Sequence, residues 1–234
     1  MDPYKEALDT VLSELKTMPE VKSILFFGSV QQGRPTATSD LDLFVLVEGN
    51  ETWNYKRKVD DIEVDVYFLP LKVCMTNLEN ENVIFVRAFS SGTALLDRQG
   101  DISEISELAK KIYKNGPKPL DSLQKNNLRI KLSEIIRDIE GLTFDAPEAI
   151  MLSSILVTSS MEAFCQLQRI WSIKHSRLIQ HITTYNPQLG KKVALFYRST
   201  GMSPNLAIDI ANDVLASTGG RLMEYDGPRM SLKF

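Results

Sequence analysis

The sequence predicts two architectures in succession: an α/β (α+β) domain built on a mixed sheet, and then an all-α helical bundle. In the first half of the chain, short apolar segments at strand spacing alternate with helical ones. Beyond Gly116 only helical periodicity remains. The segment Gly116-Pro117-Lys118-Pro119 cannot continue a helix. We therefore expect domains at residues 1–116 and 117–234, the second for acceptor binding or dimerisation.

The elements of the first domain follow from residue spacing and from helix and turn signals. Asp2-Pro3 indicates an N-cap followed by the first helical residue. A turn is expected at Asp60-Asp61, between two segments of strand character. The expected strands are 23–27, 41–47, 53–59, 62–69 and a short edge strand at 95–98, and the expected later helices are 83–89 and 102–113.

Every expected element of the second domain is a helix. The spacing of apolar residues predicts helices over 122–142, 150–173, 177–182, 188–197 and 204–215. Ser203-Pro204 opens the last of them. The chain from Gly219-Gly220 onward is expected to be loosely ordered.

Composition and charge exclude several classes of function. The 234 residues carry a net charge of −3, and the cluster Lys56-Arg57-Lys58 is typical of a solvated hairpin, so no nucleic-acid partner is expected. Two cysteines and two histidines leave little room for a zinc site or a disulfide framework. We find no signal peptide and no run of about 18 apolar residues. The expected location is therefore cytoplasmic, with no membrane partner.

The most informative stretch contains Gly28-Ser29, Gly33 and then Ser39-Asp40-Leu41-Asp42. Because a strand has period two, Asp40 and Asp42 point to one face, and the apolar residues between and after them point to the core. Two neighbouring carboxylates repel each other unless a hard divalent cation lies between them. Together with the glycine-containing turn, the pattern indicates a site for a metal and a nucleoside triphosphate.

A second strand repeats the arrangement of apolar and acidic faces. Ile62, Val64, Val66 and Phe68 alternate with Glu63, Asp65 and Tyr67. Asp65 is the expected third carboxylate of the site because it lies deeper in the apolar run. Glu63, on the same face, remains the alternative.

These motifs resemble the nucleotidyltransferase fold of the DNA polymerase beta superfamily, in particular the kanamycin, lincosamide and minimal nucleotidyltransferases. The resemblance is carried by the segment up to Pro70. It implies that Asp40 and Asp42 bind Mg²⁺, and that Asp65 helps to bind the metal or receives the acceptor's proton. It assigns Gly28, Ser29 and Ser39 to the triphosphate.

Two further features bear on the nucleotide. Arg34 lies in the same loop and is a candidate to neutralise a phosphate. Many relatives carry an arginine or another polar residue soon after Gly-Ser, where this chain has Val30-Gln31-Gln32. This departure weakens what can be inferred about nucleotide affinity.

The resemblance implies Mg²⁺-dependent transfer of a nucleoside monophosphate, AMP from ATP or another NTP, to a hydroxyl of a small molecule, with an antibiotic as one option. One alternative is an antitoxin-like enzyme that modifies a partner protein. Another is a non-catalytic nucleotide-binding regulatory module. Relatives often dimerise, so a homodimer is a further expectation.

The helical half offers few chemical signals. Relatives use this domain to hold the acceptor, sometimes with a base, for which Glu134, Asp138 and Glu140 are candidates by position. Trp171 with Lys174 resembles a tryptophan–lysine pair of related enzymes, although packing is the simpler role of Trp171. Arg169 and His175 have the spacing of the HEPN ribonuclease motif, for which a solvated surface helix is the alternative.

Overall fold

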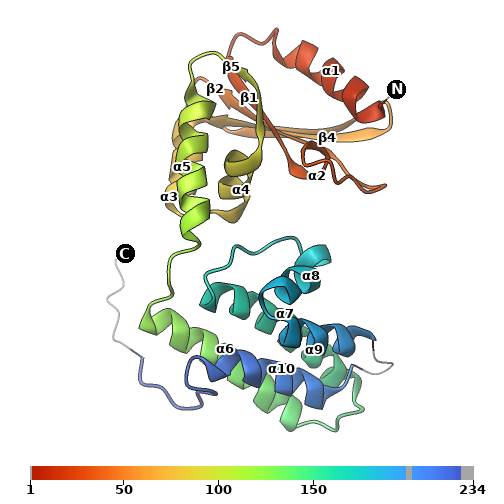
Figure 1. Cartoon of the computed structure of the whole chain (residues 1–234), viewed down its shortest axis with the longest axis vertical. Helices are drawn as coiled ribbons and strands as arrows, with labels where there is room; N and C mark the ends of the chain where they lie inside the picture. The colour runs from red at the N-terminus through yellow and green to blue at the C-terminus, as the bar shows by residue number, and fades with distance from the viewer. Residues whose placement is uncertain (1, 199–201, 228–234) are drawn as a thin grey trace. The chain divides into compact units, whose positions relative to one another are not determined.

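The computed structural model describes residues 2–198 and 202–227. The chain forms two compact units, Met1–Gly116 and Pro117–Phe234. The first contains strands and helices, and the described part of the second contains helices without strands, which confirms the predicted fold class (Figure 1). The elements are α1 (Pro3–Leu15), β1 (Val21–Phe27), α2 (Gly28–Gln31), β2 (Leu41–Val47), β3 (Trp53–Val59), β4 (Ile62–Pro70), α3 (Leu71–Glu79), α4 (Val83–Ser91), β5 (Thr93–Asp97), α5 (Asp101–Asn115), α6 (Ser122–Glu140), α7 (Pro147–Leu167), α8 (His175–Tyr185), α9 (Pro187–Arg198) and α10 (Pro204–Ala216).

The first unit is organised by one mixed sheet of five strands in the order β3-β4-β2-β1-β5. The β2/β4 pair is parallel, and the other pairs are antiparallel. A two-residue turn joins β3 to β4, and its residues Asp60 and Asp61 have φ of 48° and 66°. Positive φ at both positions matches the right-handed twist of a hairpin, and aspartate tolerates it.

Helices cover both faces of this sheet (Figure 1). On one face, α1 packs against a core that includes Leu43, Val66 and Phe68. On the other, α3, α4 and α5 pack against β1 and β4, and Phe44 contacts the rings of Phe85 and Phe89. The face that carries Asp42 is therefore polar only near the start of β2 and is buried further along that strand.

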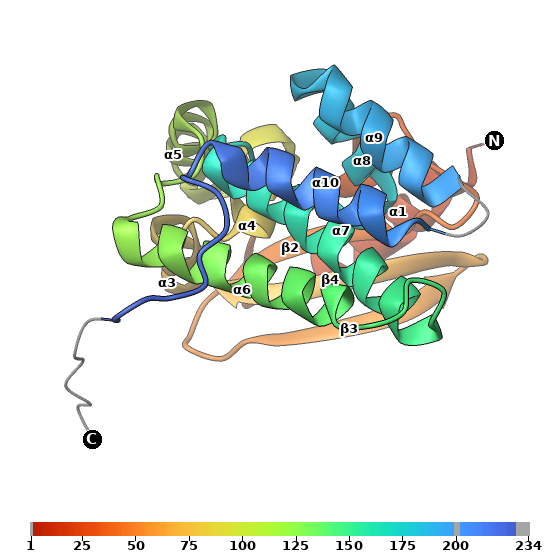
Figure 2. The same ribbon diagram turned by 90° about the horizontal axis from the view of Figure 1, so that it is seen from below.

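The second unit is built around α7, which α6 and α10 flank (Figure 2). Among the described residues, α7 is the one helix long and apolar enough by composition to cross a membrane, and half of that window is buried. Polar residues such as Ser153, Ser160 and Glu162 interrupt this helix, so it is not an unbroken apolar run. Ser153 and Ser160 are buried in this helix, and each donates a hydrogen bond to a carbonyl of its own helix, at 2.6 and 2.7 Å. A core helix of a globular protein can have the same length and composition, so α7 is weak evidence of a membrane span.

The predicted helix 150–173 begins and ends earlier than expected. It starts at Pro147 and ends at Leu167. The termination is local: Arg169 has φ of 56°, Arg169 N donates to Gln166 O, and Ile170 N donates to Cys165 O at 2.8 Å. These bonds form a Schellman motif, with arginine at the position that glycine usually occupies.

The chain after Gly219 is held in place, contrary to expectation, as far as the structure describes it. The guanidinium of Arg129 donates to the carbonyls of Gly219, Gly220 and Arg221. Arg221 pairs with Glu140 at 2.8 Å, and Leu222 N donates to Ser133 Oγ at 2.9 Å. The part of this expectation that falls on residues 228–234 lies outside the described residues.

Both cysteines are buried and free, one in each unit. Burial raises the pKa of the Cys74 thiol to about 12 and that of Cys165 to about 11. Because the thiolate is the reactive form, both side chains serve as apolar packing groups.

Asp97 joins the sheet to α5. Its carboxylate accepts hydrogen bonds from Ile102 N, Ser103 N, Ser103 Oγ and Ser23 Oγ, at 2.8–3.2 Å. Burial works against ionisation of Asp97, but the bonds donated by Ser103, Ile102 and Ser23 outweigh it and lower the pKa of this carboxyl. The carboxylate therefore stabilises the folded state at neutral pH.

We predict that Asp97→Ala lowers the free energy of unfolding at pH 7 by about 1–3 kcal/mol, because it leaves several donors without an acceptor. A carboxyl whose pKa is lowered by folding stabilises the protein above its unfolded pKa, near 3.9, and loses this contribution as pH falls through the folded value. The difference between the two proteins should therefore shrink below about pH 4. Urea denaturation over this pH range measures it, and a difference that is constant with pH would contradict the assignment.

Candidate functional site

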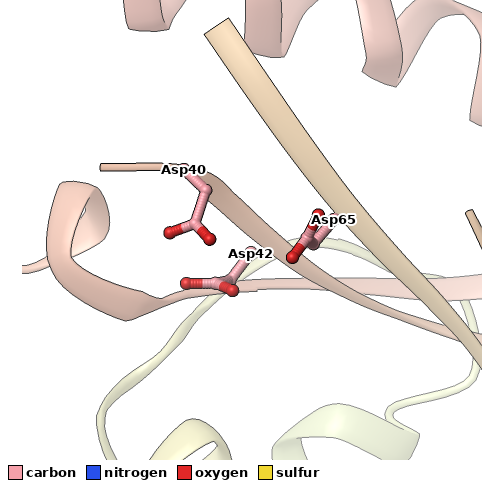
Figure 3. Close-up of side chains that lie close together, drawn as sticks. All are labelled: Asp40, Asp42 and Asp65. Atoms are coloured by element: carbon pink, nitrogen blue, oxygen red, sulfur yellow. The ribbon is translucent and has the colours of Figure 1, made fainter. Parts of the chain in front are cut away.

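The register of the central strands brings three carboxylates together. In the parallel β2/β4 pair Asp42 lies directly beside Asp65, and Asp40 immediately precedes β2. One carboxylate oxygen of each residue lies within 4.8 Å of those of the other two, and Figure 3 shows the three side chains facing one another. All three residues are partly buried.

Gly28 occupies a position that only glycine fits. Phe27 pairs with Asp42 in the β1/β2 register, so the next residue lies against the Asp42 side chain. Gly28 has φ of 90°, and a Cβ built on it would lie 2.1 Å from Asp42 Oδ2. The missing side chain at Gly28 therefore leaves the space that the Asp42 carboxylate occupies.

The loop from Ser29 to Ser39 is closed by its own hydrogen bonds. Ser29 Oγ donates to Ser39 Oγ at 2.9 Å, and Thr36 N donates to the same oxygen at 2.8 Å. The hydrogen bond between the two serines brings Ser29 and Ser39 together just before the start of β2. Arg34 lies on the exposed part of the loop, where its guanidinium donates to the side-chain carbonyl of Gln32.

A lysine that sequence reasoning missed lies beside the cluster. Lys56 is opposite Asp65 in the β3/β4 register, and its Nζ lies 3.3 Å from Asp65 Oδ2 and 3.0 Å from Glu63 Oε2. These hydrogen bonds, with Glu63 the stronger and Asp65 next, raise the pKa of the Lys56 ammonium. Glu63 lies outside the three-carboxylate cluster, so the geometry favours Asp65 over Glu63 as its third member.

Tyr67 is two residues beyond Asp65 on the same face of β4. Burial, and then the charges of Asp65 and Asp42, raise the pKa of its phenol. Tyr67 is therefore protonated at neutral pH, and its hydroxyl is a potential donor beside the acidic cluster.

The three carboxylates fit a hard divalent cation. Asp65 Oδ1 is buried and has no hydrogen-bond partner among the residues that the structure describes. A buried oxygen of this kind costs free energy unless a cation or a donor reaches it. Three carboxylate oxygens are the ligand type that Mg²⁺ prefers.

The second unit contains a groove of about 470 Å³ between α6 and α7, next to the start of the unit. Its apolar lining includes Leu128 and Ala163. Its polar lining is Lys118, Gln124, Asn127, Lys131, Ser159, Glu162 and Gln166. This volume is in the range of small-molecule sites.

Most of the helical residues named from sequence have structural partners. His175 lies 3.0 Å from Glu162, Arg169 donates to Pro117 O, and Glu140 pairs with Arg221. Trp171 is buried, as its packing role predicts. Glu134 and Asp138 are exposed on α6, and neither lines the groove.

Comparison with known proteins supports a nucleotidyltransferase fold for this chain. A family model described as "Polymerase beta, Nucleotidyltransferase" matches residues 9–101, which include all three aspartates. The crystal structure of a nucleotidyltransferase-like protein from Exiguobacterium sibiricum 255-15 is similar in fold, with a TM-score of 0.51 and 15% sequence identity over 92% of this chain and 75% of that one. No curated protein gives a significant match.

We predict that Gly28→Ala weakens Mn²⁺ binding by about 10-fold or more, because the new methyl group displaces the Asp42 carboxylate. Gly33→Ala is the matched control. Gly33 also has positive φ, 66°, but a Cβ there would meet nothing within 4 Å.

Both substitutions should cost about 1–2 kcal/mol of stability through backbone strain. Mn²⁺ titration monitored by electron paramagnetic resonance separates the two effects. Equal losses of affinity in the two variants would show that the Gly28–Asp42 contact has no special role.

Proposed function

We propose that this protein is a magnesium-dependent enzyme of the cytoplasm that transfers AMP from ATP to a hydroxyl group. The proposal starts from residues 9–101, which match the polymerase beta nucleotidyltransferase family. The observation that carries the proposal is the cluster of Asp40, Asp42 and Asp65, whose carboxylate oxygens lie within 4.8 Å of one another inside that domain. A cluster of three like charges is unfavourable unless a cation uses it.

In the proposed reaction the acceptor oxygen forms a bond to the α-phosphorus of ATP, and the bond from that phosphorus to pyrophosphate breaks. The hydroxyl proton passes to a carboxylate oxygen, for which Asp65 is the proposed group. Asp40 and Asp42, with Asp65, would hold Mg²⁺. The metal would supply positive charge that stabilises the negative charge developing on the phosphate oxygens.

Gly28, Ser29, Ser39 and Arg34 are the proposed residues for the triphosphate. Gly28 begins the short turn α2, and Phe27 before it provides no side-chain cap. The first N–H groups of this turn and the hydroxyls of Ser29 and Ser39 are donors suited to phosphate oxygens. The guanidinium of Arg34 is exposed in the same loop and could neutralise a phosphate.

The groove of the helical unit is the proposed acceptor site, with dimerisation as the alternative role of this unit. Its lining combines amides, a hydroxyl, two lysines and one glutamate with apolar side chains. Within the described part of the chain, Lys131 has no carboxylate partner. This chemistry favours a neutral or anionic hydroxylated small molecule over a polycationic antibiotic.

The protein-modifying alternative differs in its product, because the label from ATP would appear on a hydroxyl of a partner protein. The non-catalytic alternative differs in the number of carboxylates that it requires, because a protein that only binds a nucleotide does not need a third one. The position of Asp65 in the cluster therefore favours an enzyme.

We predict that Asp42→Asn lowers nucleotidyl transfer by about 10²–10³-fold or more, because it removes a charge that the metal requires. The assay follows [α-³²P]ATP and Mg²⁺ with a metabolite extract and, separately, with a protein lysate. Asp61→Asn is the matched control, since it makes the same change at the exposed β3–β4 turn.

Label on small molecules supports the main proposal, and label on protein alone supports the alternative. If no label moves from ATP in either mixture and Asp42→Asn leaves nucleotide binding unchanged, the enzyme proposal fails.

We also predict that Lys131→Met raises the KM for a small-molecule acceptor by about 5- to 10-fold with little change in kcat, because the acceptor loses a charge-assisted contact. Lys125→Met on the same helix is the control, since Lys125 does not line the groove. The measurement is the yield of labelled product at increasing concentrations of extract. Equal effects of the two variants would remove the support for this groove.

A further inference from the structure

We propose that Lys56, anchored by Glu63, serves as the internal counter-cation of Asp65 while no divalent cation is bound. The inference rests on the proposed function, because it concerns the same three carboxylates. Its basis is the geometry of the β3/β4 hairpin.

The hairpin aims the Lys56 ammonium at one oxygen of Asp65. Because the turn at Asp60-Asp61 has two residues, the register places Lys56 directly opposite Asp65 and diagonal to Glu63. Lys56 Nζ lies 3.3 Å from Asp65 Oδ2. The other oxygen of Asp65, Oδ1, is buried and has no partner in the described part of the chain. The lysine therefore occupies one oxygen and leaves the other for a metal.

Glu63 limits how strongly Lys56 competes with that metal. Glu63 Oε2 lies 3.0 Å from Lys56 Nζ, closer than the oxygen of Asp65. The ammonium is thus shared between a carboxylate outside the cluster and one inside it. Because Lys56 also pairs with Glu63, its ion pair with Asp65 is weaker. A divalent cation can therefore bind Asp65 without breaking a strong ion pair.

Removing Lys56 and removing the charge of Glu63 should change the affinity for a divalent cation in opposite directions. Without Lys56, the three carboxylates lose their nearby positive charge and attract a cation more strongly. Without the charge of Glu63, Lys56 pairs with Asp65 alone and opposes the cation more strongly. A purely structural role of Lys56 predicts weaker binding on its removal, because the orientation of Asp65 would be lost.

The experiment titrates the full-length protein with Mn²⁺ in the absence of nucleotide and follows free Mn²⁺ by electron paramagnetic resonance. Lys56→Met should tighten Mn²⁺ binding by about 5-fold, which corresponds to an exposed ion pair at the upper end of its usual strength. Lys56→Arg should stay within about 2-fold of the unmodified protein. Glu63→Gln should weaken binding, and this effect should be smaller in a Lys56→Met background because Glu63 acts through the lysine.

Lys58→Met is the matched control, because Lys58 lies on the same strand and face of β3 and its removal changes the net charge equally. A second measurement is thermal unfolding: Lys56→Met should lower the melting temperature without metal, and saturating Mn²⁺ should restore it.

Unchanged or weaker Mn²⁺ binding by Lys56→Met, or an equal gain with Lys58→Met, overturns the inference and leaves the proposed function standing. Failure of the unmodified protein to bind Mn²⁺ in a way that depends on Asp42 overturns both. If Lys56→Met does not fold, the Glu63→Gln arm decides, because unchanged affinity in that variant also contradicts the inference.

Discussion

Electrostatic repulsion among Asp40, Asp42 and Asp65 is the constraint around which the first unit is organised. Three free carboxylates in solution would move apart. In the folded protein the backbone hydrogen bonds between β2 and β4 hold Asp42 and Asp65 side by side. The apolar face behind them, packed under α1, provides the free energy that offsets the repulsion. Gly28 contributes by the absence of a side chain, since its bare Cα leaves room for the Asp42 carboxylate.

Much of this unit could be predicted from sequence because its signals are local. Period two places Asp40 and Asp42 on one face, and the alternation from Ile62 does the same for Asp65. The position of Lys56 beside Asp65 could also have been predicted, by pairing residues outward from the turn at Asp60-Asp61. The contact of Gly28 with Asp42 could not have been predicted, because it depends on the pairing of β1 with β2, which no local pattern specifies.

The helical unit shows where local patterns mislead. Apolar spacing continues past Leu167, but the left-handed conformation of Arg169 ends α7, and arginine is not a residue from which such a turn is expected. The chain after Gly219 has the composition of a flexible segment. It is nonetheless fixed by Arg129, which is 90 or more residues earlier in the sequence and close only in the folded unit.

Lys56 also lies on β3, an outer strand of the sheet with one side unpaired. An unpaired strand edge can recruit another chain through its free backbone groups, and cationic side chains along it discourage such pairing. Lys56, Arg57 and Lys58 give this edge three consecutive positive charges. If Lys56 has the role proposed for it, one side chain would serve both the chemistry of the carboxylate cluster and the solubility of the protein.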